Sequence, residues 1–299
     1  MGPLLTNIIE TIGSKNAVHG KKLRKSLSGL DKTFYDEAEQ FFDTYKTYAE
    51  SQNKSLEYGI DSYLRMVSDM MFEYIHFMKT GEYTCKSFED ANRKVYNNPN
   101  VMEYYMHGLL MSEFLWNHHH KMMKFFDEKL KAYSPKRYLE IGGGHGLFLS
   151  KAKKQFGSDT YFEMVDISES SLSMAKSFVG PTEAVYKLQD IYDYKLEESF
   201  DFITIGEVIE HVEDPVKLMK GVSALLADGG TIFMTTPTNA PAIDHIYLFR
   251  NEQEIVDVIE ASGLYVKEKL SVYSEDVTPE YGEKFNIALL YGGFLGKKD

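Results

Sequence analysis

Cysteine is almost absent from this chain of 299 residues, and Cys85 is the only one. A single thiol excludes a disulfide within the chain and is typical of a reducing compartment, so we expect a cytoplasmic protein. Long apolar runs are also missing, since none approaches the roughly 20 residues that a membrane-spanning helix needs. The N-terminus has no basic region followed by an apolar one, so we expect no signal peptide and no membrane partner.

Positive charge is in short supply, and the net charge is −12. Residues 1–135 carry 17 basic and 18 acidic side chains, whereas the remainder carries 16 and 27. Nucleic-acid binding depends largely on neutralising phosphates, and an acidic second half opposes it. A basic cluster lies in residues 15–25, and we interpret it as a solvated loop rather than an RNA or membrane contact. The charge pattern therefore favours a small-molecule partner and predicts no nucleic-acid partner.

Helical patterns dominate the first part of the chain. Asp31 can cap a helix whose aromatic side chains fall on one face. Helices are expected over residues 31–51, 56–79, 87–96 and 101–132. The last of these is expected to kink near Gly108 or Trp116. We therefore predict an all-helical N-terminal domain over residues 1–133.

Strand and helix patterns alternate from residue 134 onward, which is typical of a mostly parallel sheet covered on both faces. Strands are expected over residues 138–141, 161–166, 184–188, 200–205, 231–235, 264–272 and 285–290. Helices are expected over residues 147–156, 169–178, 214–226 and 252–262. The sequence thus predicts the α/β fold class for a second domain over residues 134–299.

A run of alternating glycines follows the first predicted strand, in the pattern E-x-G-x-G-x-G from Glu140 to Gly146. Such glycines let the backbone turn sharply and approach a ligand closely, and the helix that follows offers free N–H groups. A dinucleotide-binding loop would read G-x-G-x-x-G, but its third glycine would fall on Leu147 or Leu149. The spacing therefore points away from a dinucleotide.

Acidic residues stand at the ends of the next predicted strands. Asp166 ends the second strand, 20 residues after the last glycine of that run. A carboxylate at this place in an open α/β sheet accepts hydrogen bonds from ribose hydroxyls. Asp190 and Ile191 follow the third strand, and Gly206 and Glu207 follow the fourth. We expect all of them at one edge of the sheet.

The glycine run and these strand ends, in this order, resemble the class I S-adenosylmethionine (SAM) methyltransferases over residues 134–299. The resemblance implies a Rossmann-like sheet of seven strands, the last antiparallel, with SAM as cofactor. It also implies that Asp190 reads the adenine amino group, with Ile191 against the ring. SAM has a cationic amino-acid end, which a carboxylate such as Glu140 suits. The implied cofactor-binding residues are Glu140, Gly142, Gly144, Gly146, Asp166, Asp190, Ile191, Gly206 and Glu207.

Glu207, Glu210 and His211 are spaced i, i+3 and i+4, so their side chains share one face of a helical turn. The turn is similar to the E-x-x-E-H turn of the ubiquinone-biosynthesis O-methyltransferases. His245 resembles the later histidine of the small-RNA 3′-terminal 2′-O-methyltransferases, and Asp244 can cap the turn or join the shell. These resemblances imply that Glu207, Glu210, His211 and His245 together hold Mg²⁺, Mn²⁺, Fe²⁺ or Zn²⁺. Such an ion would lower the pKa of an acceptor hydroxyl. Many metal-independent relatives carry the same turn, so both alternatives stay open.

Aromatic and polar side chains recur near one face of the predicted 101–132 helix, and small-molecule methyltransferases of this architecture commonly close the cleft with such a helical lid. The acceptor-binding candidates are Tyr105, Ser112, Trp116, His119 and His120. The catalytic candidates for removing a proton are His211, His245 and His119, since an imidazole near neutral pKa suits that task. Packing within a helical core is the alternative for each of these residues. We also expect a homodimer formed through the helical domain.

The sequence as a whole predicts a SAM-dependent methyltransferase for a small molecule, with O-methylation favoured and a divalent metal assisting. The alternative enzyme is a metal-independent N- or C-methyltransferase with a histidine base. An RNA 2′-O-methyltransferase is a further alternative, which the charge distribution opposes. A non-catalytic SAM-binding protein is also open, although the intact cofactor motifs argue against it.

Overall fold

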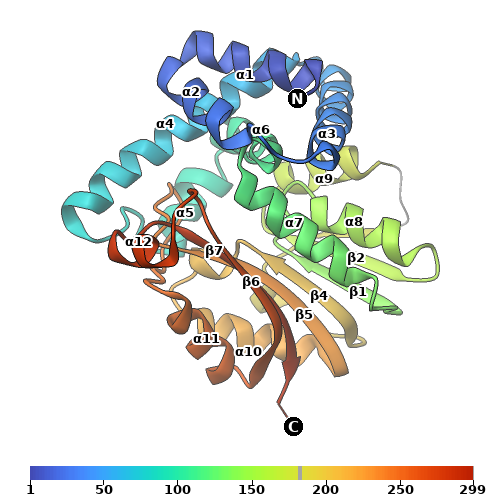
Figure 1. The fold of residues 1–299 in the computed structure, drawn as a ribbon. Coiled ribbons are helices and arrows are strands. Elements are labelled where there is room, and N and C mark those ends of the chain that lie inside the picture. Colours follow the sequence, from blue (N-terminus) through green and yellow to red (C-terminus); the bar gives the residue numbers. More distant parts are fainter. Residues whose placement is uncertain (181–183, 299) are drawn as a thin grey trace.

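The computed structural model describes residues 1–180 and 184–298, and it sets a group of helices over one edge of a β-sheet (Figure 1). Helices are the only regular secondary structure in the first 130 residues. They are α1 (Pro3–Lys15), α2 (Ala17–Leu27), α3 (Lys32–Ser51), α4 (Leu56–Thr80), α5 (Phe88–Ala91), a π-helical turn (Asn92–Tyr96), α6 (Pro99–Leu115) and α7 (Asn117–Leu130). Among the described residues, no helix combines the length and apolar character needed to cross a membrane.

A seven-stranded sheet forms the second part, in the order β3-β2-β1-β4-β5-β7-β6. Its strands are β1 (Arg137–Ile141), β2 (Tyr161–Asp166), β3 (Val185–Leu188), β4 (Phe200–Gly206), β5 (Leu226–Thr238), β6 (Leu264–Tyr273) and β7 (Leu289–Lys297). The first five are parallel, and β7 runs antiparallel to both β5 and β6. The predicted fold class is therefore confirmed, including the antiparallel last strand.

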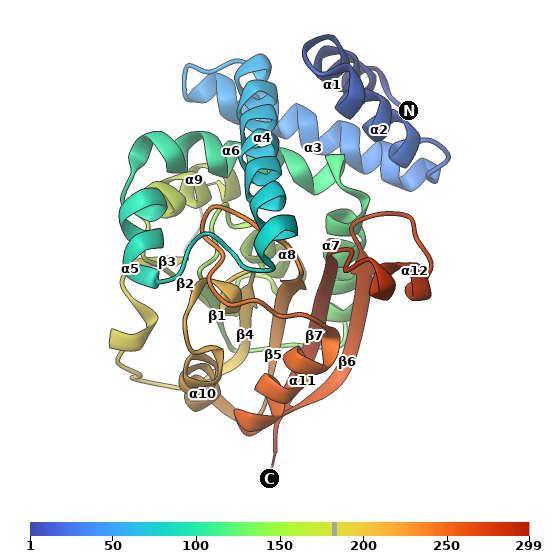
Figure 2. The same cartoon turned by 90° about the vertical axis from the view of Figure 1, so that its left-hand side faces the viewer.

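Helices cover both faces of the sheet (Figure 2). Besides α7, they are α8 (Leu147–Phe156), α9 (Glu169–Val179), α10 (Pro215–Leu225) and α11 (Glu252–Ala261), whereas α12 (Pro279–Lys284) lies in the connection between β6 and β7. Side chains alternate along β1, so Tyr138 packs with α8 and α9 while Leu139 packs with α10 and α11. Burial of both faces explains why the central strands read as nearly continuous apolar runs.

The helical part shares its core with one face of the sheet. The Phe126 ring of α7 is tilted against that of Phe233, with centroids 4.7 Å apart, and packs edge-on with that of Phe148 at 4.8 Å. A Cβ at Gly292 of β7 would lie 2.1 Å from the Met122 sulfur, so a glycine there lets α7 lie close to the sheet. The division at residue 133 stays a prediction, because α7 precedes it and packs on the strands.

The predicted 101–132 helix is interrupted at Trp116, one of the two expected kinks. Its backbone is extended (φ −115°, ψ 108°), and its N–H donates to the Ser112 carbonyl at 2.8 Å. The indole N–H donates to the Tyr63 hydroxyl at 2.8 Å, which fixes the bend against α4. Gly108 does not bend α6. A Cβ there would lie 2.9 Å from the Met66 Cβ, so this glycine allows α4 and α6 to approach.

Three local predictions were wrong. The basic residues 15–25 do not form a loop, because Asn16 caps α2 by accepting from the His19 N–H at 3.0 Å. The last strand begins at Leu289 rather than at 285, since α12 ends at Lys284 and Asn286 has a left-handed backbone. The fifth strand spans Leu226–Thr238 rather than residues 231–235.

Candidate active site

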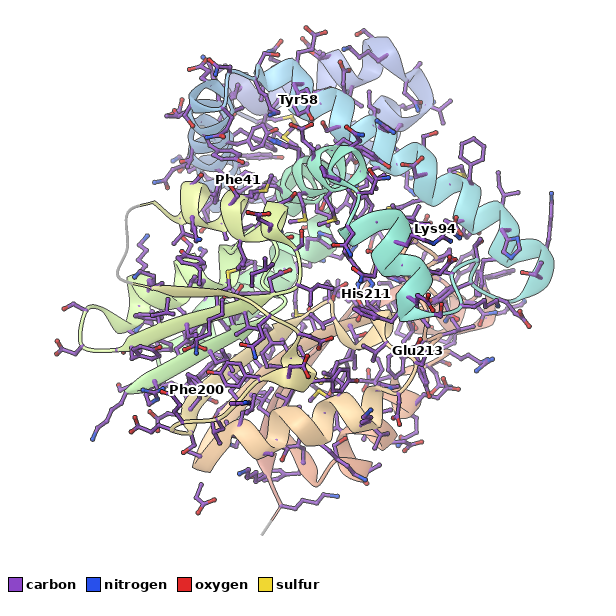
Figure 3. All side chains as sticks on the ribbon, turned by 180° about the vertical axis from the view of Figure 1, so that it is seen from behind. Phe41, Tyr58, Lys94, Phe200, His211 and Glu213 are labelled. Carbon is purple, nitrogen blue, oxygen red and sulfur yellow. The ribbon has the colours of Figure 1, made fainter. Side chains whose placement is uncertain are left out.

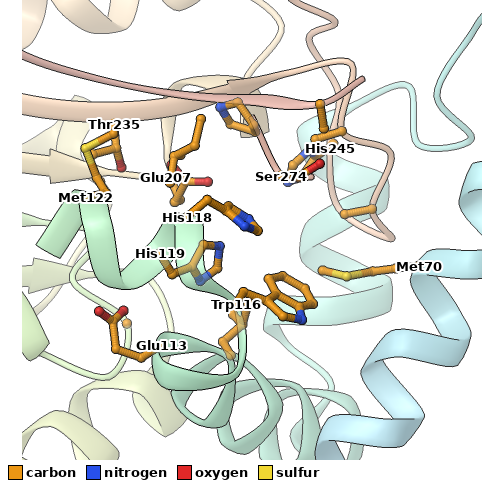
Figure 4. Close-up of a pocket in the computed structure, with 18 of the residues that line it drawn as sticks. Met70, Glu113, Trp116, His118, His119, Met122, Glu207, Thr235, His245 and Ser274 are labelled. Atoms are coloured by element: carbon orange, nitrogen blue, oxygen red, sulfur yellow. The ribbon is translucent and has the colours of Figure 1, made fainter. Parts of the chain in front are cut away.

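A cavity of about 1560 Å³ lies at the edge where the parallel strands end, beneath the helical part. Its floor includes Glu140, Gly144 and Asp166, which come from β1, the glycine run and β2. Its cover includes residues of α4, α6 and α7, such as Met70, Trp116 and Met122 (Figure 4). Ligands bind at this edge in open α/β sheets, so the cavity lies where the sequence predicts a site.

The glycine run has the backbone that its spacing predicts. Gly142, Gly144 and Gly146 all have positive φ angles, of 62°, 53° and 76°. The first two line the cavity, and the Gly144 N–H donates to Asp166 Oδ2 at 3.2 Å. Gly146 does not line it. A Cβ there would lie 3.0 Å from both Ala175 and Val179, so Gly146 allows α8 to pack on α9.

Glu140 is a buried carboxylate with one unused oxygen. Its Oε2 accepts from the Tyr138 hydroxyl at 3.0 Å, and that hydroxyl also pairs with Thr204 at 2.6 Å. Its Oε1 has no hydrogen-bond partner among the described residues. Burial raises the pKa of Glu140 to about 8. An enclosed acceptor without a donor is costly, so this site suits a cationic ligand.

The remaining predicted cofactor residues also meet at the cavity. Asp166 is buried and accepts the Ser168 N–H at 2.8 Å, and burial raises its pKa to about 6. Asp190 caps a short turn by accepting the Tyr192 N–H at 2.9 Å. A Cβ at Gly206 would lie 2.6 Å from the Phe148 ring. The lining residues of this group are Asp166, Asp190, Ile191, Gly206 and Glu207.

Three of the four predicted metal ligands converge, and Figure 3 shows one of them, His211, where the sheet meets the helices. One ligand atom each from Glu210, His211 and His245 lies within 4.8 Å of the others. Glu210 Oε2 accepts the Thr236 hydroxyl at 2.8 Å, whereas Glu210 Oε1 and His245 Nδ1 have no hydrogen-bond partner among the described residues. Glu207 lies outside this group and lines the cavity instead. The donor set therefore fits a divalent ion with two imidazoles and one carboxylate.

A hydrogen-bond network orients His211 from the helical side. Its Nδ1 lies 3.0 Å from the Asp244 carbonyl oxygen and 2.9 Å from the Tyr96 hydroxyl. The Tyr96 and Tyr105 hydroxyls donate to the two Asp244 carboxylate oxygens at 3.2 and 3.3 Å. Tyr105 lines the cavity as well, but its hydroxyl already donates a hydrogen bond to Asp244. Sequence spacing could not reveal Tyr96, which lies 115 residues before His211.

The bend between α6 and α7 carries most of the predicted acceptor residues. Trp116 and His119 line the cavity, whereas Ser112 and His120 do not. Ser112 Oγ lies 3.1 Å from His119 Nδ1, and His120 packs edge-on against Phe34 with ring centroids 4.8 Å apart. Burial lowers the pKa of His119 well below its usual value, so its imidazole is neutral. Three other cavity residues were not predicted: Glu113, His118 and His145.

A family model described as a methyltransferase domain matches residues 116–273, which is more than half of the chain. The chain belongs to this methyltransferase family. The match confirms the predicted membership of the class I SAM-dependent methyltransferases. The methyltransferase domain as matched begins at Trp116, so the predicted SAM-binding residues all lie inside it and α1 to α6 lie outside.

Two curated relatives are ubiquinone biosynthesis O-methyltransferases. That of Xanthomonas campestris pv. campestris is 33% identical over 110 residues, covering 36% of this chain and 45% of the relative. That of Coxiella burnetii is 34% identical over 117 residues, covering 38% and 48%. The matched part thus spans about half the length of these relatives.

Two solved structures share the fold of this methyltransferase. The mitomycin 7-O-methyltransferase is 13% identical with a TM-score of 0.52, over 77% of this chain and 67% of that chain. An N-methyltransferase from Bradyrhizobium japonicum, solved with S-adenosyl-L-homocysteine (SAH), is 15% identical with a TM-score of 0.50, over 70% and 98%. At these identities the likeness concerns the fold alone.

Proposed function

We propose that this protein transfers the methyl group of SAM to a hydroxyl group of a small molecule. One observation carries the proposal: a single cavity joins the glycine run and Asp166 to Glu207, His211 and His245. The first group suits an adenosine with a cationic amino-acid end, and the second suits the removal of a proton. The ubiquinone-biosynthesis relatives are named O-methyltransferases, which supports oxygen as the acceptor atom.

The residues of the cavity divide the work of methyl transfer. Bound SAM supplies an electrophilic methyl group on a sulfonium. Asp166 would accept hydrogen bonds from the ribose hydroxyls, and Glu140 would pair with the α-ammonium group. The helices over the cavity would exclude water and hold the acceptor oxygen in line with the methyl group. One proton must leave the acceptor hydroxyl as its bond to carbon forms.

The proposed metal centre consists of Glu210, His211 and His245. Its unpartnered Glu210 Oε1 and His245 Nδ1 are the atoms that an ion would use. Two imidazoles and one carboxylate suit Zn²⁺, Fe²⁺ or Mn²⁺ better than Mg²⁺, which prefers oxygen ligands. An ion held there would act as a Lewis acid toward the acceptor hydroxyl.

The network around His211 supports a metal-free alternative. Asp244 and Tyr96 fix the orientation of the ring through Nδ1, which leaves Nε2 for the substrate. An imidazole held in this way can act as a general base toward an oxygen or nitrogen acceptor. The acidic second half of the chain opposes RNA as substrate, and the single cysteine supports a cytoplasmic location.

Methyl transfer is tested by incubating the purified protein with SAM and a panel of hydroxylated and aminated small molecules. SAH should form with at least one hydroxylated acceptor. SAH formation with amines alone would replace the oxygen acceptor with nitrogen. A protein that binds SAH but turns over no acceptor would instead be a non-catalytic SAM-binding protein.

Metal dependence separates the two ways of removing the proton. Chelation should abolish turnover and Zn²⁺, Fe²⁺ or Mn²⁺ should restore it, and His245→Ala should remove this metal response with little change in SAH affinity. His76→Ala alters an exposed histidine of α4 and serves as the matched control. Full turnover after chelation and in His245→Ala would favour His211 as a metal-free base.

A further inference from the structure

Glu113 of α6 is a buried carboxylate that the proposed reaction does not use. It is 7% exposed and lines the cavity below the α6–α7 bend, on the same wall as His118 and His119 (Figure 4). Its Oε1 is fully enclosed and has no hydrogen-bond partner among the described residues. No ion pair involving Glu113 occurs within 4 Å in that part of the chain either. The Glu113 carboxyl group therefore has no direct ion-pair partner among the described residues.

The surroundings of Glu113 disfavour the ionised form of its carboxyl group. Burial raises its pKa to about 8, and the opposing influence comes from Lys151 of α8. The Lys151 ammonium pairs with Asp127 at 3.2 Å rather than with Glu113. A buried carboxylate without a partner is unfavourable unless a ligand supplies a positive group. The open side of Glu113 is the cavity, so such a ligand would enter from there.

The position of Glu113 along α6 relates it to the glycine run. Met106 and Glu113 are seven residues apart, so they share one face of the helix, about 10 Å apart along its axis. The Met106 methyl lies 3.2 Å from the place where a Gly144 Cβ would be, so this face of α6 covers the glycine run. Glu113 lies farther along the same face, toward α8.

Imidazoles accompany this carboxylate at the same end of the cavity. The rings of His118 and His119 lie 4.6 Å apart at the α6–α7 bend. His145 of the glycine run lines the same cavity as these two rings. Glu113 and Glu140 line this cavity with the imidazoles, so carboxylate oxygens are available to the α-ammonium group of an α-amino acid, and a neutral imidazole N–H can donate to its carboxylate. SAM ends in such an α-amino acid.

We propose that Glu113 binds the α-ammonium group of the SAM methionine moiety from the helical side, opposite Glu140. The inference rests on the proposed function and extends it, because α6 lies outside the matched methyltransferase domain. Cofactor binding would then tie α6 to the sheet and complete the acceptor pocket.

The test compares two ligands by calorimetry: SAH and 5′-methylthioadenosine, which has the same adenosine and thioether but no amino-acid end. Glu113→Gln should weaken SAH binding about tenfold or more, as expected for a lost charge-assisted hydrogen bond, and should change methylthioadenosine affinity less than about twofold. Glu103→Gln is the matched control on α6, since Glu103 is exposed and pairs with Lys54 at 2.8 Å. Its affinities should equal those of the wild type.

Three results would overturn the inference. They are unchanged SAH affinity in Glu113→Gln, equal losses for both ligands, and a loss of the same size in Glu103→Gln. If Glu113→Gln does not fold, as judged by its melting temperature, Glu113→Met enters the same comparison. A wild-type protein that binds methylthioadenosine but gains nothing from the amino-acid end would also contradict it. Failure to bind either ligand would overturn the proposed function itself.

Discussion

Left-handed backbone conformations gather at the cavity, at Gly142, Gly144 and Glu207. Glycine adopts them freely, but a side chain costs about 1–2 kcal/mol in this region. Glu207, with φ 54°, is held there by its N–H, which donates to the Thr235 carbonyl at 3.0 Å. Backbone strain of this kind concentrates at functional sites, and here the three residues with positive φ angles all line the cavity at the edge of the sheet.

Gly144→Val should abolish measurable SAH binding, because a branched side chain would enter the cavity from a left-handed backbone (φ 53°) beside Met106. Calorimetry with SAH measures the loss. Gly81→Ala is the control, since Gly81 also has a left-handed backbone (φ 70°, ψ 15°) but no atom within 4 Å of its Cβ position. Both variants should lose about 1–2 kcal/mol of stability, and only the first should lose the ligand. SAH binding by Gly144→Val with wild-type affinity would remove the glycine run from the site.

Asp166 should make adenosine binding depend on pH. Burial raises its pKa to about 6, so the carboxyl is protonated at pH 5 and ionised at pH 7. Ribose hydroxyls donate to the ionised form, so affinity should rise with pH and level off above pH 7, about tenfold tighter than at pH 5. Methylthioadenosine is the ligand to use, because it lacks the ammonium group that Glu140 and Glu113 would bind. Asp166→Asn should flatten the profile, and an unchanged profile in that variant would contradict the assignment.

At the scale of elements, the sequence predicted what depends on local pattern. The cap Asp31 placed α3 correctly, and the alternation of strand and helix patterns placed α11 and the parallel strands. The glycines of β7 concealed how far the last strand extends, because Gly292 gives room to Met122 of α7 rather than forming a turn. The sequence predicted a kink at either Gly108 or Trp116 but could not select between them. The bend at Trp116 is fixed by a hydrogen bond to Tyr63, which lies more than 50 residues away.

The candidate site was predictable to the same extent. Residues at strand ends, such as Asp166 and His211, follow from spacing along the chain. His245 was found through its resemblance to a known ligand pattern. Tyr96 and Glu113 carry no local signal, because their roles arise only when α6 and the π-helical turn fold over the sheet.

The α6–α7 bend should control the acceptor more than the cofactor. Trp116→Phe keeps an aromatic ring but loses the indole hydrogen bond to Tyr63, so the bend should loosen. The acceptor KM should rise several-fold, with less than a twofold change in SAH affinity. Tyr63→Phe removes the same bond from the other side and should act alike. A purely stabilising role would instead lower the melting temperature and leave KM and SAH affinity unchanged, which would contradict the prediction.

At the scale of the whole molecule, one apolar core extends from α1 to β7 and encloses the cavity between the helical part and the sheet. The matched methyltransferase domain supplies the side of this cavity that carries the predicted SAM-binding residues, while α4 and α6 supply much of the other side. Differences in acceptor between relatives can therefore arise in the helices without changing the cofactor residues.

A crystal structure of the protein with SAH tests the central claim most directly. We predict the ribose hydroxyls within about 2.6–3.2 Å of the Asp166 carboxylate, the adenine beside Asp190 and Ile191, and the sulfur facing the His211 side of the cavity. SAH bound with its ribose away from Asp166, or outside the cavity, would contradict the account.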